Sequence, residues 1–174
     1  PHRYVVQEHW RGKSVHADFR IESVGNDALI GWTLNVLIAG AIKDSVETLA
    51  QAKALKPADY SKIDWETGEF KKRRKEGAEA LVDVEIVAER KAVEPHAWLT
   101  VEGEVKPGEV GATANFPGVF RIVDKGACDY GAQKPWFHEY FPRSDRDKGG
   151  FRYRLIFRQL RVADIQEENR GKAL

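Results

Sequence analysis

The chain has 174 residues, of which 42% are hydrophobic and 32% are charged. This length predicts a single domain spanning residues 1–174, because one hydrophobic core serves about 100–200 residues. The formal net charge of +1 does not by itself indicate a polyanionic partner, and the lone Cys128 excludes an intrachain disulfide framework or a cysteine-rich zinc site.

The first residues lack the apolar core of a signal peptide, and the longest apolar stretch, residues 28–42, is shorter than the roughly 20 residues of a transmembrane helix. Together with the lone cysteine, this predicts a cytoplasmic protein with no membrane partner. The sequence contains no Met and begins with Pro1. We therefore expect that the chain was processed or cut from a longer protein.

Alternation of apolar and polar residues predicts β-strands early in the chain, at residues 4–8, 15–22 and 28–36, with a turn at 23–27. The pattern then changes. Asp44 or Ser45 is expected to cap a helix that ends near Leu55, just before Lys56-Pro57. A second helix is expected in the charged stretch at residues 66–80.

Further strands are expected in the second half of the chain, at residues 81–87, 98–105, 119–123, 136–141 and 151–158. Turns are expected at 106–111 and 144–150, followed by a charged tail at 164–174. Many short strands with one helical stretch are typical of a compact all-β fold. We predict a mainly β protein, a small closed or partly open β-barrel with a helical insertion at about residues 43–80.

The strand predicted at residues 15–22 carries His16, Asp18 and Arg20 on one face, because side chains alternate across a strand. One interpretation is a half-exposed strand with a solvated polar face. Such faces usually carry Thr, Lys, Glu or Ser, whereas this one offers an imidazole, a carboxylate and a guanidinium. The composition therefore favours a ligand-binding face.

His9 adds a second imidazole. If the strands predicted at residues 4–8 and 15–22 pair through a short hairpin turn, one register places Gln7 and His9 on the same face as His16 and Asp18. The sequence alone leaves this register open. Two imidazoles and a carboxylate suit a divalent transition ion such as Mn²⁺, Fe²⁺ or Zn²⁺, with positions left for catalysis. Arg20 beside them offers bidentate binding of a phosphate.

Two motifs strengthen this hypothesis, namely RYVVQEH at residues 3–9 and HADFRIE at residues 16–22. Two weaker blocks are Trp32 in LIGWTLNV and EGEVKPGEVG at residues 102–111. Together they resemble the 3′-phosphoesterase domain of bacterial DNA ligase D and its stand-alone archaeal relatives. The resemblance covers roughly residues 3–36 and 86–158.

The resemblance implies a small β-barrel that heals DNA or RNA 3′ ends in repair by non-homologous end joining. Members of the family remove a terminal ribonucleoside and then the 3′-phosphate, with Mn²⁺ as cofactor and Zn²⁺ or Co²⁺ as alternatives. The implied partners are duplex or primer–template 3′ ends and a ligase or polymerase in the same chain or complex. The implied residues are the metal ligands His9, His16 and Asp18, the substrate-binding Gln7 and Arg20, and the catalytic Arg90 and His96.

The chain departs from the family pattern in several places. Seven residues instead of six separate the first two histidines, and Asn35-Val36-Leu37 stands where the family has Pro-Lys-Gly. The family's late tyrosine has no counterpart unless Trp98 fills its space, and residues 37–80 resemble an insertion. The metal triad is retained, but these changes bring the phosphomonoesterase step into question.

Two groups of basic residues outside these motifs can each be interpreted in two ways. Lys71–Lys75 is either a solvated helix face or a contact to the DNA backbone. Arg152 and Arg154 share a strand face, which suits either a nucleic-acid groove or a charged sheet edge. We interpret His138 as a packing histidine, and Cys128 has no companion that would make it a nucleophile.

Three functional hypotheses follow. The first is a metal-dependent phosphoesterase acting on nucleic-acid 3′ ends. The second is a catalytically degenerate module that holds DNA ends for a repair or ligase protein. The third is a metal-dependent hydrolase of small phosphoesters.

Overall fold

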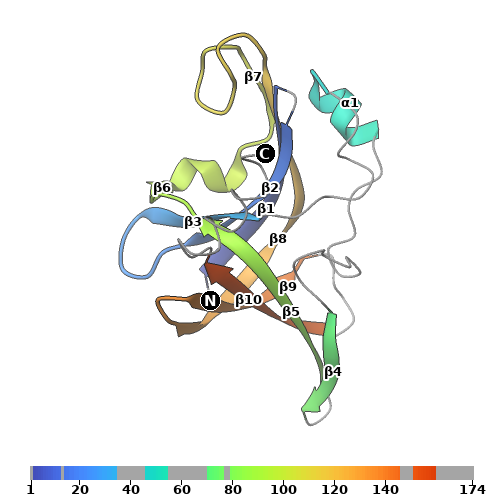
Figure 1. Ribbon diagram of the computed structural model, residues 1–174, viewed down its shortest axis with the longest axis vertical. Coiled ribbons are helices and arrows are strands. Elements are labelled where there is room, and N and C mark those ends of the chain that lie inside the picture. Colours follow the sequence, from blue (N-terminus) through green and yellow to red (C-terminus); the bar gives the residue numbers. More distant parts are fainter. Residues whose placement is uncertain are drawn as a thin grey trace, which may run out of the picture.

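The computed structural model describes residues 2–12, 14–34, 46–54, 70–76, 79–145 and 151–159. Its elements are shown in Figure 1 and are, in chain order, β1 (His2–Arg11), β2 (Ser14–Glu22), β3 (Ala28–Leu34), α1 (Leu49–Ala54), β4 (Phe70–Glu76), β5 (Glu79–Arg90), β6 (Glu94–Pro95), the 3₁₀ helix η1 (His96–Thr100), β7 (Gly103–Val105), β8 (Gly118–Gln133), β9 (Phe137–Ser144) and β10 (Phe151–Gln159).

The strands form a nearly closed β-barrel, as predicted (Figure 1). Going round the barrel, the order is β1, β2, β3, β5, β10, β9 and β8, and β8 pairs again with β1. Neighbours are antiparallel except for β5 and β10, which are parallel. Among the described residues, the join between β3 and β5 is short and pairs Trp32–Leu34 with Ala88–Arg90.

Aromatic side chains fill the barrel and connect its two sides. The ring of Phe19 on β2 lies 5.6 Å from Tyr4, 5.3 Å from Tyr140 and 5.0 Å from Phe157, measured between centroids. Trp32 on β3 donates from Nε1 to the hydroxyl of Tyr140 at 3.2 Å. Large apolar rings at such spacings contribute both burial and favourable ring geometry, so this cluster holds the barrel together.

Both faces of the β1–β2 hairpin are buried, which the sequence did not predict. The inner face carries Ala17, Phe19 and Ile21 into the barrel core. The outer face carries the polar residues, yet Asp18 is 0% and Arg20 is 2% exposed. η1 contacts this hairpin and helps to cover its polar face, so the interpretation of a solvated polar face is wrong.

The predicted helix at residues 66–80 is also wrong over the part that the structure describes. Phe70–Glu76 form β4, which pairs antiparallel with β5. The charge of this stretch suggests a helix, but its sequence has no apolar helical period. Pairing with a neighbouring strand decides its structure, and lysine-rich strands are well suited to the edge of a sheet.

Other expectations hold with shifted boundaries. The first predicted helix appears as α1, where Thr48 Oγ1 accepts a hydrogen bond from the Gln51 amide at 3.2 Å. Residues 98–105 are split between η1 and β7, and the strand at 119–123 is part of the longer β8. Asp44 and Ser45, the Asn35-Val36-Leu37 segment and the tail at 164–174 lie outside the described residues.

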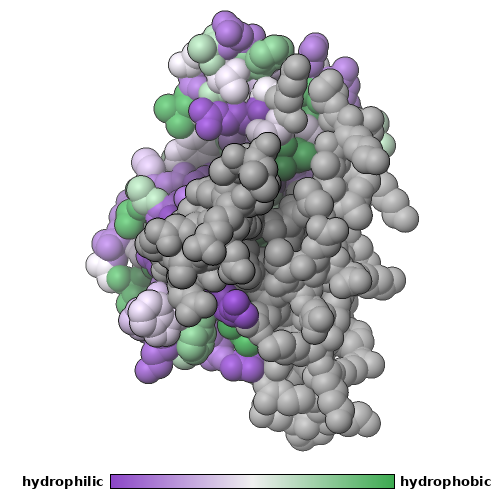
Figure 2. All heavy atoms as spheres, in the orientation of Figure 1, coloured by the Kyte–Doolittle hydropathy of each residue, from purple (hydrophilic) through white to green (hydrophobic). Residues whose placement is uncertain are grey.

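Large exposed apolar side chains of the described chain lie in the connections between strands. They are Val24, Val93, Val110, Phe116 and Trp136. On the coloured part of the face in Figure 2, hydrophilic and hydrophobic residues are interspersed. Within the described chain, no helix has both the length and the apolar character needed to cross a membrane.

Candidate metal centre

The pairing of β1 with β2 brings the three predicted metal ligands together. His9 lies directly opposite His16, and Gln7 lies directly opposite Asp18. Directly opposed residues of an antiparallel pair project from the same face, so all four side chains share one surface of the hairpin. The spacing of seven residues fits this pairing because only residues 12 and 13 connect the strands. The sequence left the pairing register open, and the structure has the register that places all four side chains on one face.

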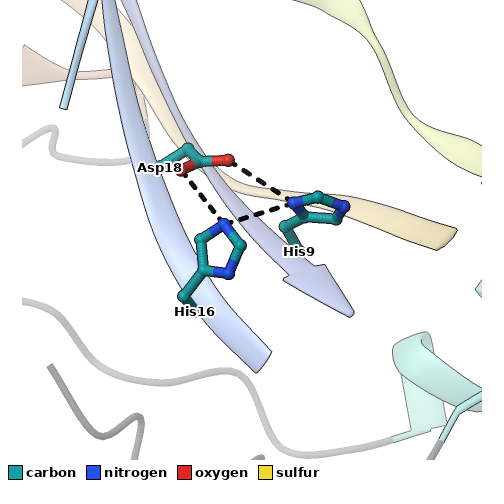
Figure 3. Close-up of side chains that lie close together, drawn as sticks. All are labelled: His9, His16 and Asp18. Carbon is teal, nitrogen blue, oxygen red and sulfur yellow. Dashed lines mark hydrogen bonds and ion pairs between the residues drawn. The ribbon is translucent and has the colours of Figure 1, made fainter. Parts of the chain in front are cut away.

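The side chains of His9, His16 and Asp18, called the triad below, point toward one another (Figure 3). His9 Nδ1 is 3.2 Å from His16 Nε2 and 3.7 Å from Asp18 Oδ2, and His16 Nε2 is 3.3 Å from Asp18 Oδ1. Ligand atoms about 2.1 Å from a common ion are roughly 3.0–3.5 Å apart at octahedral or tetrahedral angles. The triad therefore fits a divalent ion with little rearrangement.

Two neighbours orient the ring of His9. Its Nε2 donates to the carbonyl of Gly111 at 2.6 Å, and its ring stacks on Phe120 with 4.1 Å between centroids. The carbonyl can only accept, so the proton sits on Nε2 and the lone pair of Nδ1 faces the triad, as in most metal-binding histidines. Burial lowers the pKa of His9 to about 4, so the ring is neutral and able to ligate at pH 7.

Gly111 can present this carbonyl because it is a glycine. Its backbone has φ +97°, a conformation that residues with a Cβ rarely adopt, and a Cβ there would lie 2.7 Å from the ring of Phe120. The last glycine of the EGEVKPGEVG block therefore orients a candidate metal ligand.

Asp18 is fully buried and surrounded by donors. Its Oδ1 lies 3.2 Å from Lys91 Nζ and accepts a hydrogen bond from Thr33 Oγ1 at 3.4 Å. Burial alone would raise the pKa of Asp18, but the hydrogen bond with His16 and the charges of Arg20 and Lys91 lower it below its usual value. Asp18 is therefore ionised at neutral pH, which is the form that binds a metal.

The guanidinium of Arg20 is held by three acceptor side chains. Its Nη1 donates to Gln7 Oε1, and its Nη2 lies 3.3 Å from Asp18 Oδ2. Nε and Nη2 donate to the two carboxylate oxygens of Glu94, at 3.3 Å and 3.4 Å. The predicted phosphate-binding arginine is thus beside the triad, but one edge of its guanidinium already faces a carboxylate.

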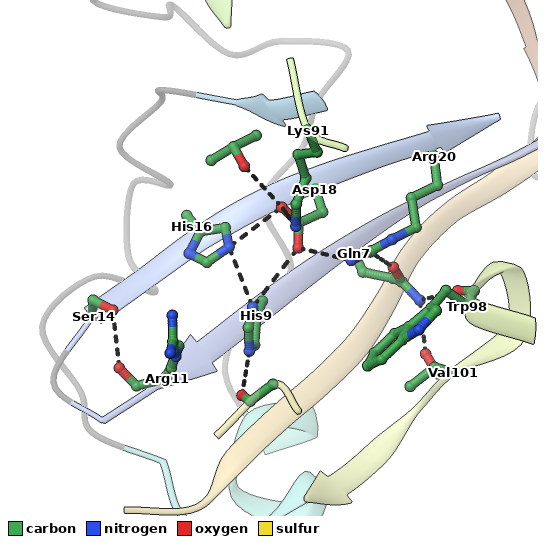
Figure 4. A network of polar contacts seen from close by, with 12 residues as sticks. Gln7, His9, Arg11, Ser14, His16, Asp18, Arg20, Lys91, Trp98 and Val101 are labelled. Carbon is green, nitrogen blue, oxygen red and sulfur yellow. Dashed lines mark hydrogen bonds and ion pairs between the residues drawn. The ribbon is translucent and has the colours of Figure 1, made fainter. Parts of the chain in front are cut away.

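Gln7 positions Arg20 from the other side (Figure 4). Its Nε2 donates to the backbone carbonyls of Trp98, at 3.0 Å, and Val101, at 2.9 Å. Both acceptors are carbonyls, so the amide nitrogen must face them and the amide oxygen must face Arg20. The Arg20 guanidinium also lies 5.4 Å from the centre of the Trp98 ring.

A pocket of about 420 Å³ borders this cluster, a volume that suits a small ligand or the end of a larger one. It is lined by both polar and apolar groups, namely His9, Arg11, Arg20, Lys91, Glu94, Trp98, Gly108, Glu109, Val110, Gly111, Ala112 and Phe120.

Arg90, a predicted catalytic residue, is not brought to the triad. It pairs with Trp32 across β3 and β5, and Trp32 pairs with Phe19, so all three side chains face the barrel interior. Arg90 Nη1 donates there to His138 Nδ1 at 3.3 Å. The sheet itself separates Arg90 from the metal centre.

His96 shares the polar face but lies at its end. Its Nε2 is 2.8 Å from Oε2 of Glu22, four residues beyond Asp18 on β2, or about 13 Å along the strand. This hydrogen bond lowers the pKa of Glu22 and raises the pKa of His96. The structure therefore pairs His96 with a carboxylate and does not place it at the triad.

Arg154, another predicted residue, also lies away from the pocket. Arg154 donates to Glu139 on β9, and β10 is separated from the β1–β2 hairpin by two strands in either direction round the barrel. The side chains of Arg152 and of the Lys71–Lys75 run on β4 lie outside what the structure describes.

The interpretation of His138 as a packing histidine is confirmed. Its ring lies 4.9 Å from Trp32, and its Nδ1 is 3.0 Å from the hydroxyl of Tyr140. Burial and the charge of Arg90 lower the pKa of His138 to about 4. Cys128 is buried as well, and burial raises its thiol pKa to about 12, which does not suit a nucleophile.

Sequence reasoning missed Lys91 and Glu94, which both reach the polar cluster. They lie in the same ERKAVEPH segment from which Arg90 and His96 were chosen. Strand alternation continued one residue past the end of β5 could have indicated that Arg90 and Lys91 face opposite ways. Which of them faces the triad depends on the pairing of β5 with β3, which sequence alone does not specify.

No protein-family model and no curated protein matches the chain. The resemblance to the ligase D 3′-phosphoesterase domain therefore rests on the motifs alone.

Proposed function

We propose that this protein is a metal-dependent phosphoesterase that acts on nucleic-acid 3′ ends in DNA repair. The observation that carries the proposal is the convergence of the triad with Arg20 and Lys91 beside a pocket. Phosphoryl transfer is catalysed mainly by positioning and by neutralising negative charge on the phosphoryl oxygens. A cation site flanked by two cationic side chains provides both.

The triad would hold the ion, with Mn²⁺ as the proposed cofactor and Zn²⁺ or Co²⁺ as alternatives. Such an ion supplies Lewis-acid polarisation of the phosphoryl group and lowers the pKa of a bound water. Lys91, whose side chain is 27% exposed, would donate to a non-bridging phosphoryl oxygen, while Gln7 keeps Arg20 in place. His96 could assist only after leaving Glu22.

The choice of nucleic acid as substrate is supported by the RYVVQEH and HADFRIE motifs and their resemblance to the end-healing family. Arg11 supports it as well. This exposed arginine borders the pocket on the side of His9, and its Nε donates to the Ala112 carbonyl at 3.3 Å. Cationic groups on both sides of the triad suit a chain with successive phosphates.

The proposal is tested with Mn²⁺ and a primer–template whose 3′ end is a single ribonucleotide, compared with one that ends in a 3′-phosphate. We expect Mn²⁺-dependent release of the terminal nucleoside. His16→Ala should reduce that rate by about hundredfold or more, because it removes a ligand. His2→Ala, which changes a histidine outside the triad, should retain the rate. If the wild type releases nothing from either end, the proposal is wrong.

Metal binding is tested independently of activity. Anomalous diffraction from crystals soaked in Mn²⁺ should give a peak within ligand distance of the triad. An anomalous peak elsewhere, with none at the triad, would contradict the assignment of the ligands.

A second candidate is a DNA-end-binding module without chemistry. The observation that favours it is that the Glu94 carboxylate accepts hydrogen bonds from Arg20 Nε and Nη2, the groups with which a phosphoesterase would bind the phosphate. This candidate predicts DNA affinity that falls steeply with salt and survives Asp18→Ala. Loss of DNA binding in Asp18→Ala would argue against it.

A further inference from the structure

The pocket contains an acid where a phosphate would be expected. Glu94 approaches the Nε–Nη2 edge of Arg20 with one oxygen on each nitrogen, at 3.3 Å and 3.4 Å. This two-point contact is also how a guanidinium binds a phosphate. Glu94 is 18% exposed in its side chain and lines the pocket, so its charge faces any substrate that enters.

The fold makes room for this contact. Gly31 on β3 lies directly opposite Arg20 on β2, and a Cβ at Gly31 would stand only 2.7 Å from Glu94 Oε1. The pairing of Glu94 with Leu29 places the carboxylate over this glycine. The contact therefore depends on a particular residue on each of three strands and differs from a chance ion pair between mobile surface side chains.

We propose that Glu94 sets the substrate class of this site by admitting phosphodiesters and disfavouring terminal phosphomonoesters. The inference rests on the proposed phosphoesterase function and refines it. A diester phosphate carries one negative charge, whereas a 3′-phosphate carries close to two above pH 7. The fixed charge of Glu94 repels the second form more strongly, and its carboxylate occupies the Nε–Nη2 edge of Arg20 that a phosphate would otherwise bind.

The reaction retained by the site is hydrolysis of the last diester. An oxygen of water bonds to phosphorus, the bond from phosphorus to the 5′ oxygen of the terminal ribonucleoside breaks, and that oxygen takes up a proton from the water. The products are a free nucleoside and a 3′-phosphate. Because the product is the disfavoured form, it leaves the pocket, and a separate phosphomonoester hydrolase must remove the phosphate.

Binding to the metal-free protein tests the inference without catalysis. The probes are two otherwise identical labelled oligonucleotides, one ending in 3′-OH and one in 3′-phosphate. We expect the wild type to bind both within about twofold and Glu94→Gln to bind the 3′-phosphate about tenfold more tightly than the 3′-OH. Glu47→Gln removes the same charge at an exposed position outside the pocket and should leave the ratio unchanged.

Gly31→Ala provides a second variant that keeps the charge of Glu94. Its added Cβ displaces the carboxylate from Arg20, so the preference for the 3′-phosphate should again rise. Circular dichroism and the melting temperature establish that each variant is folded. If both folded variants keep the wild-type binding ratio, the inference is overturned.

Activity with Mn²⁺ separates this inference from the proposed function. We expect the wild type to have a higher kcat/KM for the ribonucleoside-ended diester than for the 3′-phosphate, and Glu94→Gln to reduce that ratio about tenfold. Cleavage of the diester with an unchanged ratio in Glu94→Gln would refute the role of Glu94 and leave the phosphoesterase standing. If no substrate is cleaved but Glu94→Gln binds the 3′-phosphate about tenfold more tightly, the proposed phosphoesterase function is refuted and the effect of Glu94 on phosphate binding stands.

Discussion

Two carboxylates are buried on opposite faces of the first hairpin. Glu8 on β1 faces the barrel side, directly opposite Arg121 on β8, whose Nε lies 3.1 Å from Glu8 Oε2. Arg121 also donates to the Ala52 carbonyl of α1 and lies 5.5 Å from the Trp10 ring. Both charged side chains are less than 7% exposed.

Asp18 on the other face is equally buried but has a different kind of environment. It meets two imidazoles, a guanidinium and an ammonium group, and its neighbour His9 borders a pocket. Glu8 and Asp18 are both buried, so burial of a carboxylate does not by itself indicate function. What distinguishes Asp18 is the convergence of metal-ligating groups where a ligand has access.

The largest expected effect is on the barrel side. Arg121→Leu leaves the charge of Glu8 buried without its guanidinium, which should lower the free energy of unfolding by about 3–5 kcal/mol and the melting temperature by about 10 °C. Urea unfolding measures the loss, and Mn²⁺ affinity should stay unchanged. The double variant Glu8→Leu, Arg121→Leu should recover much of the stability. A loss below about 1 kcal/mol would contradict a structural role for this pair.

On the metal side, Asp18→Asn should reduce Mn²⁺ affinity by about hundredfold or more, because a neutral amide replaces the charged ligand. Its effect on the free energy of unfolding should be smaller than that of Arg121→Leu, since the amide oxygen still accepts a hydrogen bond. Isothermal titration with Mn²⁺ measures the first quantity. Equal Mn²⁺ affinity in Asp18→Asn and the wild type would remove the distinction between the two carboxylates.

A smaller effect is expected at Lys91, whose Nζ is 3.2 Å from Asp18 Oδ1. Lys91→Gln removes a cation that competes with the ion for Asp18, so Mn²⁺ affinity should rise about tenfold. Turnover should fall, because a donor to the phosphoryl group is lost. Lys91→Arg, which keeps the charge, should show neither the gain in affinity nor a comparable loss of turnover. A loss of Mn²⁺ affinity in Lys91→Gln would contradict this assignment.

The smallest effect concerns pH and the barrel interior. The pKa of His138 is lowered from 6.5 to about 4 by burial and by Arg90, so the unfolded chain binds a proton there between these pH values while the folded chain does not. Its contribution to stability is present above pH 6.5 and is lost as the pH falls toward 4. His138→Phe should therefore make this decline shallower in urea unfolding at pH 7 and pH 5.

The decline should not vanish, because the pKa of His9 is also lowered to about 4. Mn²⁺ affinity at pH 7 should be unchanged in His138→Phe, since this side chain packs on Trp32 and Tyr140 inside the barrel. An unaltered pH dependence in this variant would mean that His138 titrates alike in both states.

Much of the metal centre could be predicted from the sequence, because it is built on neighbouring strands. Alternation along residues 15–22 placed His16, Asp18 and Arg20 on one face, and the seven-residue spacing fits a hairpin in which His9 opposes His16. Strand alternation and a short turn are local properties, so they are written in consecutive residues. The same locality made the barrel class predictable from many short alternating strands.

Tertiary structure decided the parts that depend on strands far apart in the chain. The pairing of β3 with β5 turns Arg90 toward His138 and away from the triad, while Lys91 reaches Asp18. Pairing with β5 makes residues 70–76 a strand where charge alone pointed to a helix. Shifting a strand by one residue exchanges its two faces, and the energy that selects the register comes from distant partners. Local sequence therefore determined the three candidate ligands and Arg20, and long-range pairing determined that Lys91 and Glu94 stand beside them.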